Sequence, residues 1–424
     1  MPLKKISSTD SALVETFLKS AGKSLERFRY FNSRPISVLS QHRVTLLYFN
    51  ENNLPVGYGH LDEENGVTWL GNCVAEKETG KGIGKKIMQG LLNFARENKI
   101  QNIRLSVDAN NKTAQSLYEN FGFKVIEKRE AVHFYEWEAK KNPEILISTL
   151  ALAGLPAEKI IEEAEKNKWN IEFSSGMPYR PDMEEFFLQA KIIRYAHNYF
   201  PAPEIPFVLN LASSNVNIRR TSIEHCVKGM KLSYACGARF FSAHSGFCID
   251  PSPAELGNPL EKKAFNDKKT HWNLFIDSVK EILHRTKEID LRFLIENNVI
   301  AKMNMYDGGL NPLLCCNADE INELIHTIND KKLGILLDTG HMKVSANTLG
   351  FDAATAVRNI ANHIDCIHHS DNNGEFDTNH SLPNDYWFNT FLPEFSFATH
   401  VLEVKKINAV EINKQIDLIR ENMV

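Results

Sequence analysis

The chain has 424 residues, of which 43% are hydrophobic and 24% are charged, a composition typical of globular proteins with room for more than one core. Its beginning has no apolar stretch after the basic residues, and no apolar run reaches about 18 residues, so we expect a cytoplasmic protein without a signal peptide or membrane span. Seven scattered cysteines without CxxC spacing indicate reduced thiols. Residues 1–140 hold 20 basic against 16 acidic side chains and the remainder holds 29 against 37. An acidic second part argues against a nucleic-acid partner.

The first part of the chain mixes short strands and helices. It closes with AVHFYEWEAK, an alternating segment typical of a late antiparallel strand. The polar stretch AKKNP at 139–143 follows, and polar linkers are where few contacts cross between domains. We therefore expect two domains, residues 1–140 and 141–424.

A glycine-rich turn stands inside the first domain. Gly80, Gly82 and Gly84 lie between a strand that ends near Val74 and a helix that begins near Gly84. Glycines at such a turn let backbone N–H groups face an anion, and the start of the helix adds partial positive charge. The turn therefore predicts a pyrophosphate site, although a purely structural turn remains open.

A second motif narrows the choice. After the predicted strand NIRLSV, the spacing Asn111-x-x-Ala114-x-x-x-Tyr118 places these residues along one side of a short helix. Together with the glycine-rich turn, this resembles the GNAT superfamily of acetyl-CoA-dependent N-acetyltransferases over residues 1–138. The resemblance implies a cofactor-binding set and makes Tyr118 the acid that protonates the departing thiolate. The cofactor-binding set is Val74, Thr79, Gly80, Lys81, Gly82, Ile83, Gly84 and Asn111.

Three points about this site stay open. Thr79 stands where the family usually has Arg or Gln, so one contact to the pyrophosphate is in doubt and a non-catalytic acetyl-CoA sensor is an alternative. Tyr118 could instead be a core aromatic. The base that takes the proton from the acceptor amine is not identified by the sequence, and our candidates are His60 and Asp62 in YGHLDEE.

The second domain repeats short apolar strands with helical stretches between most of them. Eight such strands over about 280 residues predict a (β/α)₈ barrel, with an open doubly wound sheet as the alternative. One of the intervening stretches, DMEEFFLQAKIIRYAHNYF, is predicted to be helical. The predicted strands are 144–149, 170–175, 206–211, 239–244, 292–297, 333–338, 366–370 and 400–404.

Ionisable residues close five consecutive predicted strands. Such groups would be costly to bury without a shared partner, and a divalent cation is the simplest one. A donor set of carboxylates with one imidazole suits Mn²⁺, Mg²⁺, Co²⁺ or Zn²⁺. The five residues are His244, Glu296, Asp338, His368 and Glu403.

This arrangement resembles the xylose-isomerase-like TIM-barrel superfamily, which includes sugar and sugar-phosphate isomerases and epimerases, some dehydratases and AP endonucleases of the endonuclease IV type. The resemblance implies that Glu296, Asp338, His368 and Glu403 bind the metal, with Glu296 and Glu403 also catalytic. It also implies that His244 and His341 lie in the pocket, in contact with substrate or just behind the metal ligands. Asp377 and His380 lie in a loop that resembles one of the isomerase and epimerase members, and they either contact substrate or hold that loop over the pocket.

The nuclease branch is the less favoured one. FVLNLASSNVNIRRTSIEH looks like the corresponding nuclease segment, but Glu204 stands where that branch has a histidine, three residues before Phe207. Asp377-x-x-His380 also replaces its Asp-x-His motif. We therefore expect a bifunctional enzyme, an N-acetyltransferase joined to a metal-dependent sugar or sugar-phosphate isomerase or epimerase. Its partners would be small-molecule substrates, and a homo-oligomer is compatible with the sequence.

Overall fold

The computed structural model describes residues 2–98, 100–138, 144–263 and 267–423. The chain divides into two compact units, Met1–Asn142 and Pro143–Met423, each with its own core. The boundary expected at 139–143 lies outside the described residues. Within the described parts, no helix combines the length and the apolar character needed to cross a bilayer.

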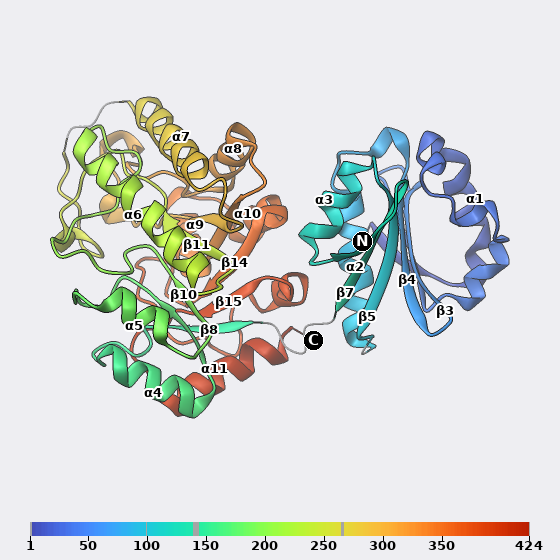
Figure 1. Ribbon diagram of the computed structural model, residues 1–424. Helices are drawn as coiled ribbons and strands as arrows, with labels where there is room; N and C mark the ends of the chain where they lie inside the picture. The colour runs from blue at the N-terminus through green and yellow to red at the C-terminus, as the bar shows by residue number, and fades with distance from the viewer. Residues whose placement is uncertain (1, 99, 139–143, 264–266, 424) are drawn as a thin grey trace. The chain divides into compact units, whose positions relative to one another are not determined.

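The first unit is a seven-stranded mixed sheet with helices on both faces (Figure 1). Its strand order is β1-β2-β3-β4-β5-β7-β6, and only β4 and β5 pair in parallel. The strands are β1 (Leu3–Ile6), β2 (Val44–Phe49), β3 (Pro55–Glu64), β4 (Val67–Val74), β5 (Asn102–Asp108), β6 (Lys124–Lys128) and β7 (Val132–Glu138). The helices are α1 (Ser11–Ser20), α2 (Ile83–Glu97) and α3 (Lys112–Asn120).

Alternation along β3 decides which helix covers which face of this sheet. Tyr58 stacks on Phe17 of α1, with 5.8 Å between the ring centroids. Gly57 and Gly59 point the other way, where a Cβ would come within 2.3–2.8 Å of Ile83 or Ile87 of α2. Because successive strand residues face opposite sides, α1 and α2 pack on opposite faces.

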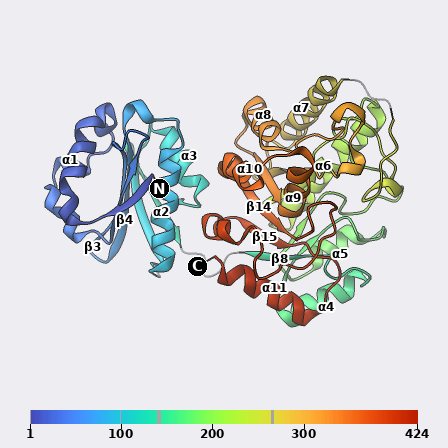
Figure 2. The same cartoon turned by 180° about the vertical axis from the view of Figure 1, so that it is seen from behind.

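The second unit is an eight-stranded parallel barrel with helices around the outside (Figures 1 and 2), so the predicted fold class is confirmed. The barrel strands are β8 (Ile145–Ser148), β9 (Asn170–Phe173), β10 (Arg194–Ala196), β11 (Phe240–His244), β12 (Arg292–Glu296), β13 (Leu333–Asp338), β14 (Ile364–His369) and β15 (Thr399–Leu402). The helices are α4 (Ala157–Asn167), α5 (Met183–Gln189), α6 (Val216–Ala235), α7 (Lys268–Arg285), α8 (Ala318–Ile328), α9 (Thr339–Leu349), α10 (Ala353–Ile360) and α11 (Ala409–Glu421).

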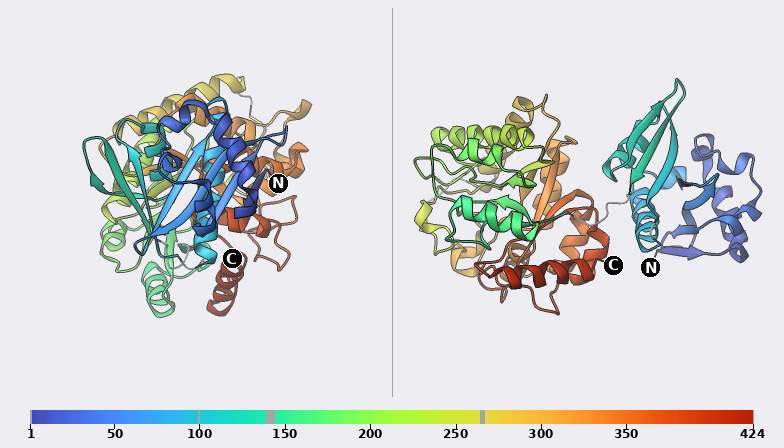
Figure 3. Two further views of the ribbon diagram at one scale, coloured as in Figure 1. Left: turned by 90° about the vertical axis from the view of Figure 1, so that its right-hand side faces the viewer. Right: turned by 60° about the horizontal axis from the view of Figure 1, so that its bottom comes forward.

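The barrel closes in two places. At the chain ends, β15 pairs with β8, and α4 lies beside α11 (Figure 3), where the indole nitrogen of Trp169 donates a 2.9 Å hydrogen bond to Asn413. At the other seam, between β10 and β11, His197 forms a single bridge with Ser242, and the Asn198 N–H donates to the Ser242 carbonyl at 2.7 Å.

One predicted strand is wrong. Residues 206–210 have no regular secondary structure, and the third strand is β10, inside the stretch predicted to be helical. The helix in that stretch, α5, ends at Gln189. Ile192 and Ile193 precede Arg194 and Tyr195, and such a run of β-branched and aromatic residues favours an extended strand. Tyr195 is buried inside the barrel, so packing there completes the preference.

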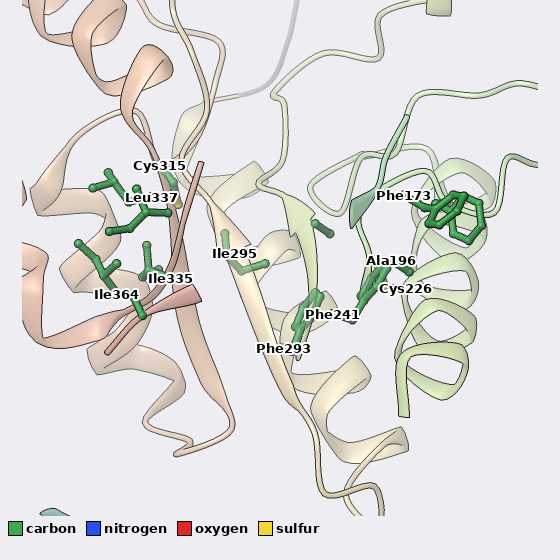
Figure 4. Packing of buried hydrophobic residues seen from close by; sticks show 14 of the residues in the cluster. Phe173, Ala196, Cys226, Phe241, Phe293, Ile295, Cys315, Ile335, Leu337 and Ile364 are labelled. Carbon is green, nitrogen blue, oxygen red and sulfur yellow. The ribbon is translucent and has the colours of Figure 1, made fainter. Parts of the chain in front are cut away.

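Two apolar layers follow from the alternation along the strands. Outward residues such as Phe293 and Ile295 pack under the helices, and the Phe293 ring stacks on Phe241 at 6.3 Å (Figure 4). Inward residues form a separate small core inside the barrel, which includes Leu294 and Leu336. The positions two residues beyond these inward residues therefore face the barrel axis at its carboxyl end.

Candidate functional site

The inward positions at the carboxyl ends of the strands carry polar side chains. Each follows an inward apolar residue by two positions, so the same alternation that fills the barrel with apolar side chains turns these groups toward its mouth. His368 thus faces inward and its neighbour His369 outward, where His369 contacts His400. The pairs are Tyr195 and His197, Leu294 and Glu296, Leu336 and Asp338, Cys366 and His368, and Val401 and Glu403.

The structure brings together the four residues expected to bind a metal. One ligand atom from each of Glu296, Asp338, His368 and Glu403 lies within 4.8 Å of the others. His368 Nδ1 lies 2.5 Å from Glu403 Oε2 and 4.0 Å from Asp338 Oδ2. Asp338 also caps α9, because its Oδ1 accepts the His341 N–H at 2.7 Å. One carboxylate thus serves both as a helix cap and as a member of the cluster.

Sequence reasoning missed two residues of this cluster. Glu172 on β9 is fully buried, and its Oε2 lies 3.1 Å from His368 Nε2. His197 follows β10, and its Nε2 lies 3.2 Å from Glu296 Oε2. His197 was missed because the third strand was predicted at 206–211 and not at Arg194–Ala196. Glu172 carried a signal that was overlooked, since it is the only charged residue in the predicted strand NIEFSS.

Three of the four pocket residues join the cluster and one does not. His244 Nε2 lies 3.5 Å from Glu296, and His341 lies between Glu296 at 3.3 Å and Asp377 at 3.2 Å. The His380 side chain is exposed, and its backbone pairs with Asp371 at the base of the loop. His380 therefore fixes the loop that carries Asp377 and does not line the cluster.

The buried carboxylates of the cluster raise the pKa values of Asp338 and of the neighbouring imidazole of His368. Burial, with Glu403, Asp377 and Glu296 nearby, raises the pKa of Asp338 to about 8. Burial opposes a charge on His368, but Glu172 and Glu403 raise its pKa well above the usual range. The carboxylates are thus compensated by imidazoles that hold protons.

Burial would also raise the pKa of Glu296, but His244, His197 and His341 lower it well below its ordinary value. The pKa of Glu403 is lowered as well, because its pairing with His368 outweighs the effect of burial. Both glutamates are therefore ionised at neutral pH, as a proton acceptor must be.

The residues present fit a divalent cation. Within the described parts of the chain, the buried oxygens Asp338 Oδ2 and Asp377 Oδ1 have no hydrogen-bond donor. Leaving such oxygens unpaired is costly, and a shared cation removes the cost. The donors are carboxylates and imidazoles without thiolates, a set that suits Mn²⁺, Co²⁺, Zn²⁺ or Mg²⁺.

The glycine-rich turn in the first unit has the geometry of an anion cradle. Gly80 and Gly82 have positive φ angles of 83° and 74°, and a Cβ on Gly80 would meet open space. Among the described residues, the N–H groups of Gly80, Lys81 and Gly82 donate to no backbone carbonyl. The Lys81 ammonium pairs with Glu78 at 2.9 Å, and the Thr79 hydroxyl donates to the Glu76 carbonyl. The backbone N–H groups are therefore the part of this turn left available to an anion at the start of α2.

The sheet opens beside this turn. β4 and β5 pair only at Thr68–Ile103 and Trp69–Arg104, so the rest of β4 up to Val74 has no β5 partner. Asn72 on this stretch donates to the Gly84 carbonyl at 3.0 Å and ties β4 to the start of α2. The backbone of β4 beyond Trp69 therefore has no strand partner on the β5 side.

The remaining predicted residues of this unit lie at α3 and on β3. Asn111 caps α3, with its side chain accepting the Ala114 N–H at 3.3 Å, so this oxygen already has a partner. Tyr118 is buried beside Phe123, and burial raises its pKa, which keeps the hydroxyl protonated. His60 and Asp62 lie on β3, on the face covered by α1.

Comparison with known proteins agrees with both architectures. Residues 162–395 match the family model of the xylose isomerase-like TIM barrel, and residues 13–136 match that of the acetyltransferase (GNAT) domain. No curated protein sequence matches the chain significantly.

Solved structures resemble the second unit. A D-tagatose 3-epimerase-like protein is 17% identical with a TM-score of 0.51, over 66% of this chain and 97% of its own. D-psicose 3-epimerase with D-tagatose from Clostridium cellulolyticum is 14% identical with a TM-score of 0.45, over 66% and 95%. Endonuclease IV from Thermus thermophilus is 14% identical with a TM-score of 0.42, over 66% and 99%. At such identities the likeness shows the fold alone. The chain belongs to the xylose isomerase-like TIM-barrel family, and a GNAT acetyltransferase domain precedes its barrel.

Proposed function

We propose that the protein is a bifunctional enzyme, an acetyl-CoA-dependent N-acetyltransferase joined to a divalent-metal-dependent isomerase or epimerase of a sugar or sugar phosphate. The observation that carries the barrel half is the ring of buried carboxylates at the strand ends, with oxygens that no donor meets among the described residues. A divalent cation held by Glu296, Asp338, His368 and Glu403 would polarise the carbonyl and the adjacent hydroxyl of a bound substrate.

The two glutamates supply the proton transfer. Glu296 and Glu403 are both ionised, and either can take a proton from the carbon beside the carbonyl. Return of a proton to the opposite face of that carbon inverts it, and return to the neighbouring carbon exchanges aldose for ketose. Loss of water from the same enediolate would give a dehydratase. His341, held between Glu296 and Asp377, is placed to orient a substrate hydroxyl.

A single experiment covers all substrates of this class. The protein with Mn²⁺ is incubated in D₂O with a panel of ketoses and ketose phosphates, and proton NMR follows loss of the carbon-bound proton beside the carbonyl. We expect exchange with at least one member of the panel, abolished in Glu296→Gln and retained in Glu375→Gln, which changes an exposed glutamate in the loop before Asp377. Absence of exchange across the panel would refute the isomerase and epimerase assignment.

A nuclease is the second candidate, and His197 is the observation that favours it. Glu204 was an argument against the nuclease only while the third strand was predicted at 206–211. The third strand is β10, and a histidine, His197, follows it directly. Three overlapping donor groups meet here, and two of them share His197. Cleavage of a duplex with an abasic site, lost in both His197→Ala and Glu296→Gln, would support this candidate over the isomerase.

In the first unit, the N–H groups of the Gly80–Gly82 turn and the opening between β4 and β5 support binding of acetyl-CoA, and the buried Tyr118 hydroxyl supports a role as the acid for the thiolate. The proposed acceptor is an amino sugar or nucleotide amino sugar, which would link the two units in precursor synthesis for a surface glycan. Release of CoA thiol with such acceptors tests it. Binding of acetyl-CoA without turnover would instead identify a sensor.

A further inference from the structure

A cluster of four polar side chains lies under α1, on the face of the sheet opposite α2. Tyr30 begins a short 3-10 turn (Tyr30–Asn32), His42 follows another (Ile36–Gln41), and His60 and Asp62 lie on β3. The Tyr30 hydroxyl lies 2.7 Å from Asp62 Oδ2 and 2.8 Å from His42 Nε2. On the far side of its ring, His42 Nδ1 lies 2.8 Å from the Thr45 hydroxyl.

The directions of these hydrogen bonds follow from an ionised carboxylate. Asp62 can only accept, so the single Tyr30 proton is donated to it. Tyr30 must then accept from His42 Nε2–H, and His42 Nδ1 must accept from the Thr45 hydroxyl. Each group in this series of hydrogen bonds thus has a partner, and the series holds Asp62 Oδ2 in one position.

The other oxygen of the same carboxylate is unused. Among the described residues, Asp62 Oδ1 is buried without a hydrogen-bond partner, and the nearest imidazole nitrogen, His60 Nε2, is 3.8 Å away. The His60 ring is 1% exposed and stacks on His42, with 4.5 Å between centroids. In the described chain no Arg or Lys side chain forms a salt bridge with Asp62, and Arg34, which acts on it from a distance, pairs with Glu64.

The cluster adjoins the opening in the sheet. Asp62 is the β3 partner of Trp69, the last β4 residue paired with β5, and His60 is the partner of Gly71, which lies beyond that point. The His60 ring occupies the space above Gly71, where a Cβ would approach within 2.2 Å of it. The cluster therefore borders the stretch of β4 beside which the proposed thioester would lie.

We propose that Asp62 Oδ1 binds the ammonium group of the acceptor and takes its proton, and that Tyr30 and His42 are positioning residues that hold the carboxylate for this step. The inference rests on the proposed acetyltransferase function. Asp62 removes one proton from R–NH₃⁺, the amine nitrogen bonds to the thioester carbonyl carbon, and the C–S bond breaks. The second proton of the nitrogen goes to the leaving thiolate, and the proton on Asp62 passes to solvent after release of the amide and CoA thiol.

The charge states around Asp62 support this role. Burial raises its pKa above the ordinary value, which makes it a stronger base, while the Tyr30 hydrogen bond lowers it. Burial lowers the pKa of His42 to about 4 and that of His60 well below its usual range, so both are neutral at pH 7. The other charged groups that act on Asp62 are Arg34 and Glu64. The two imidazoles beside the carboxylate are thus neutral, and Arg34, which lowers the pKa of Asp62, is itself paired with Glu64 at 3.0 Å.

The test is the pH dependence of acetyl transfer by the full-length protein, measured as CoA thiol release with a panel of amino sugars and nucleotide amino sugars. Tyr30→Phe removes a donor to the carboxylate, so the acid limb of kcat/KM should move up by about one pH unit, with binding of acetyl-CoA unchanged. Asp62→Asn should lose about 10²–10³-fold at pH 7 and recover as the pH approaches the pKa of the amine, because the free amine then needs no base.

Matched controls are Glu63→Gln, an exposed neighbour of Asp62, and Tyr48→Phe on β2, and both should behave as wild type. A purely structural role of the cluster would lower activity equally at every pH, and that result would overturn the proposal. Unchanged profiles in Tyr30→Phe and Asp62→Asn would also overturn it while leaving the acetyltransferase intact. Absence of transfer to any amine in wild type would refute the acetyltransferase function itself.

Discussion

Replacing Asp338 by asparagine should stabilise the metal-free protein and at the same time abolish metal binding. Asparagine has nearly the same shape and keeps an oxygen for the His341 N–H, which Asp338 accepts at 2.7 Å. What disappears is a buried acid that must hold its proton at pH 7, since its pKa is about 8 and its neighbours include the carboxylates of Glu403, Asp377 and Glu296. The substitution therefore removes the free-energy cost of burying this acid and keeps the cap of α9.

The size of the effect follows from the pKa. The Asp338 pKa is 3.8 without its surroundings and about 8 in the folded protein. Below about pH 4 the acid is protonated in both the folded and the unfolded state. As the pH rises to about 8 the unfolded state ionises first, so the free energy of unfolding falls progressively. At pH 7 the loss spans about 3 pH units, an upper bound on the order of 4 kcal/mol. Redistribution of protons on His341 and His368 reduces this, so we expect a gain of about 1–3 kcal/mol and a Tm higher by several degrees.

Calorimetry at pH 7 in EDTA, and again with excess Mn²⁺, measures both halves of the prediction. Wild type should rise in Tm with Mn²⁺, whereas Asp338→Asn should be the more stable protein in EDTA and should not respond. Asp352→Asn is the control, because Asp352 caps α10 in the same way but lies outside the cluster, and its replacement should change little. A variant less stable than wild type in EDTA, or one that still responds to Mn²⁺, would refute the reasoning.

Three further predictions concern the metal cluster of the barrel and the glycine-rich turn of the first unit. Mn²⁺ affinity should fall about tenfold for each pH unit below about pH 8, because the ligand Asp338 must lose its proton, and a flat titration series between about pH 6.5 and 8 would contradict this. Gly80→Ala should strain a φ of 83° by about 1–2 kcal/mol and weaken acetyl-CoA binding about tenfold by calorimetry, with Mn²⁺ binding unchanged. His197→Ala should keep one Mn²⁺ per chain, bound about 10–100-fold more weakly because Glu296 loses a partner, and metal analysis would detect complete loss.

Most of the barrel could be predicted because its strands are short, apolar and separated by clear helices. β10 could not, since Arg194–Ala196 is three residues long and begins only a few residues after α5 ends, so one helix period fits both segments. What decides its conformation is the space inside the barrel, which Tyr195 fills. That information lies in tertiary packing and not in the local pattern.

The site residues on the strands could be predicted from the alternation of inward and outward side chains. A polar residue two positions after an inward apolar residue marks Glu296, Asp338 and His368, and the same rule marks His197 once β10 is placed. The position of His380 was not predictable, because a loop residue can turn its side chain either way. In the structure its backbone pairs with Asp371 and its side chain faces solvent.

The seam between β10 and β11 is linked to the metal cluster through His197. Among the described residues, the bridge between His197 and Ser242 and the adjacent Asn198 hydrogen bond join the two edges there, and His197 also reaches Glu296 across the seam. Because Glu296 is also one of the proposed metal ligands, a bound cation would hold one partner of this contact in place. Binding of the cation should then also stabilise the closed seam of the barrel.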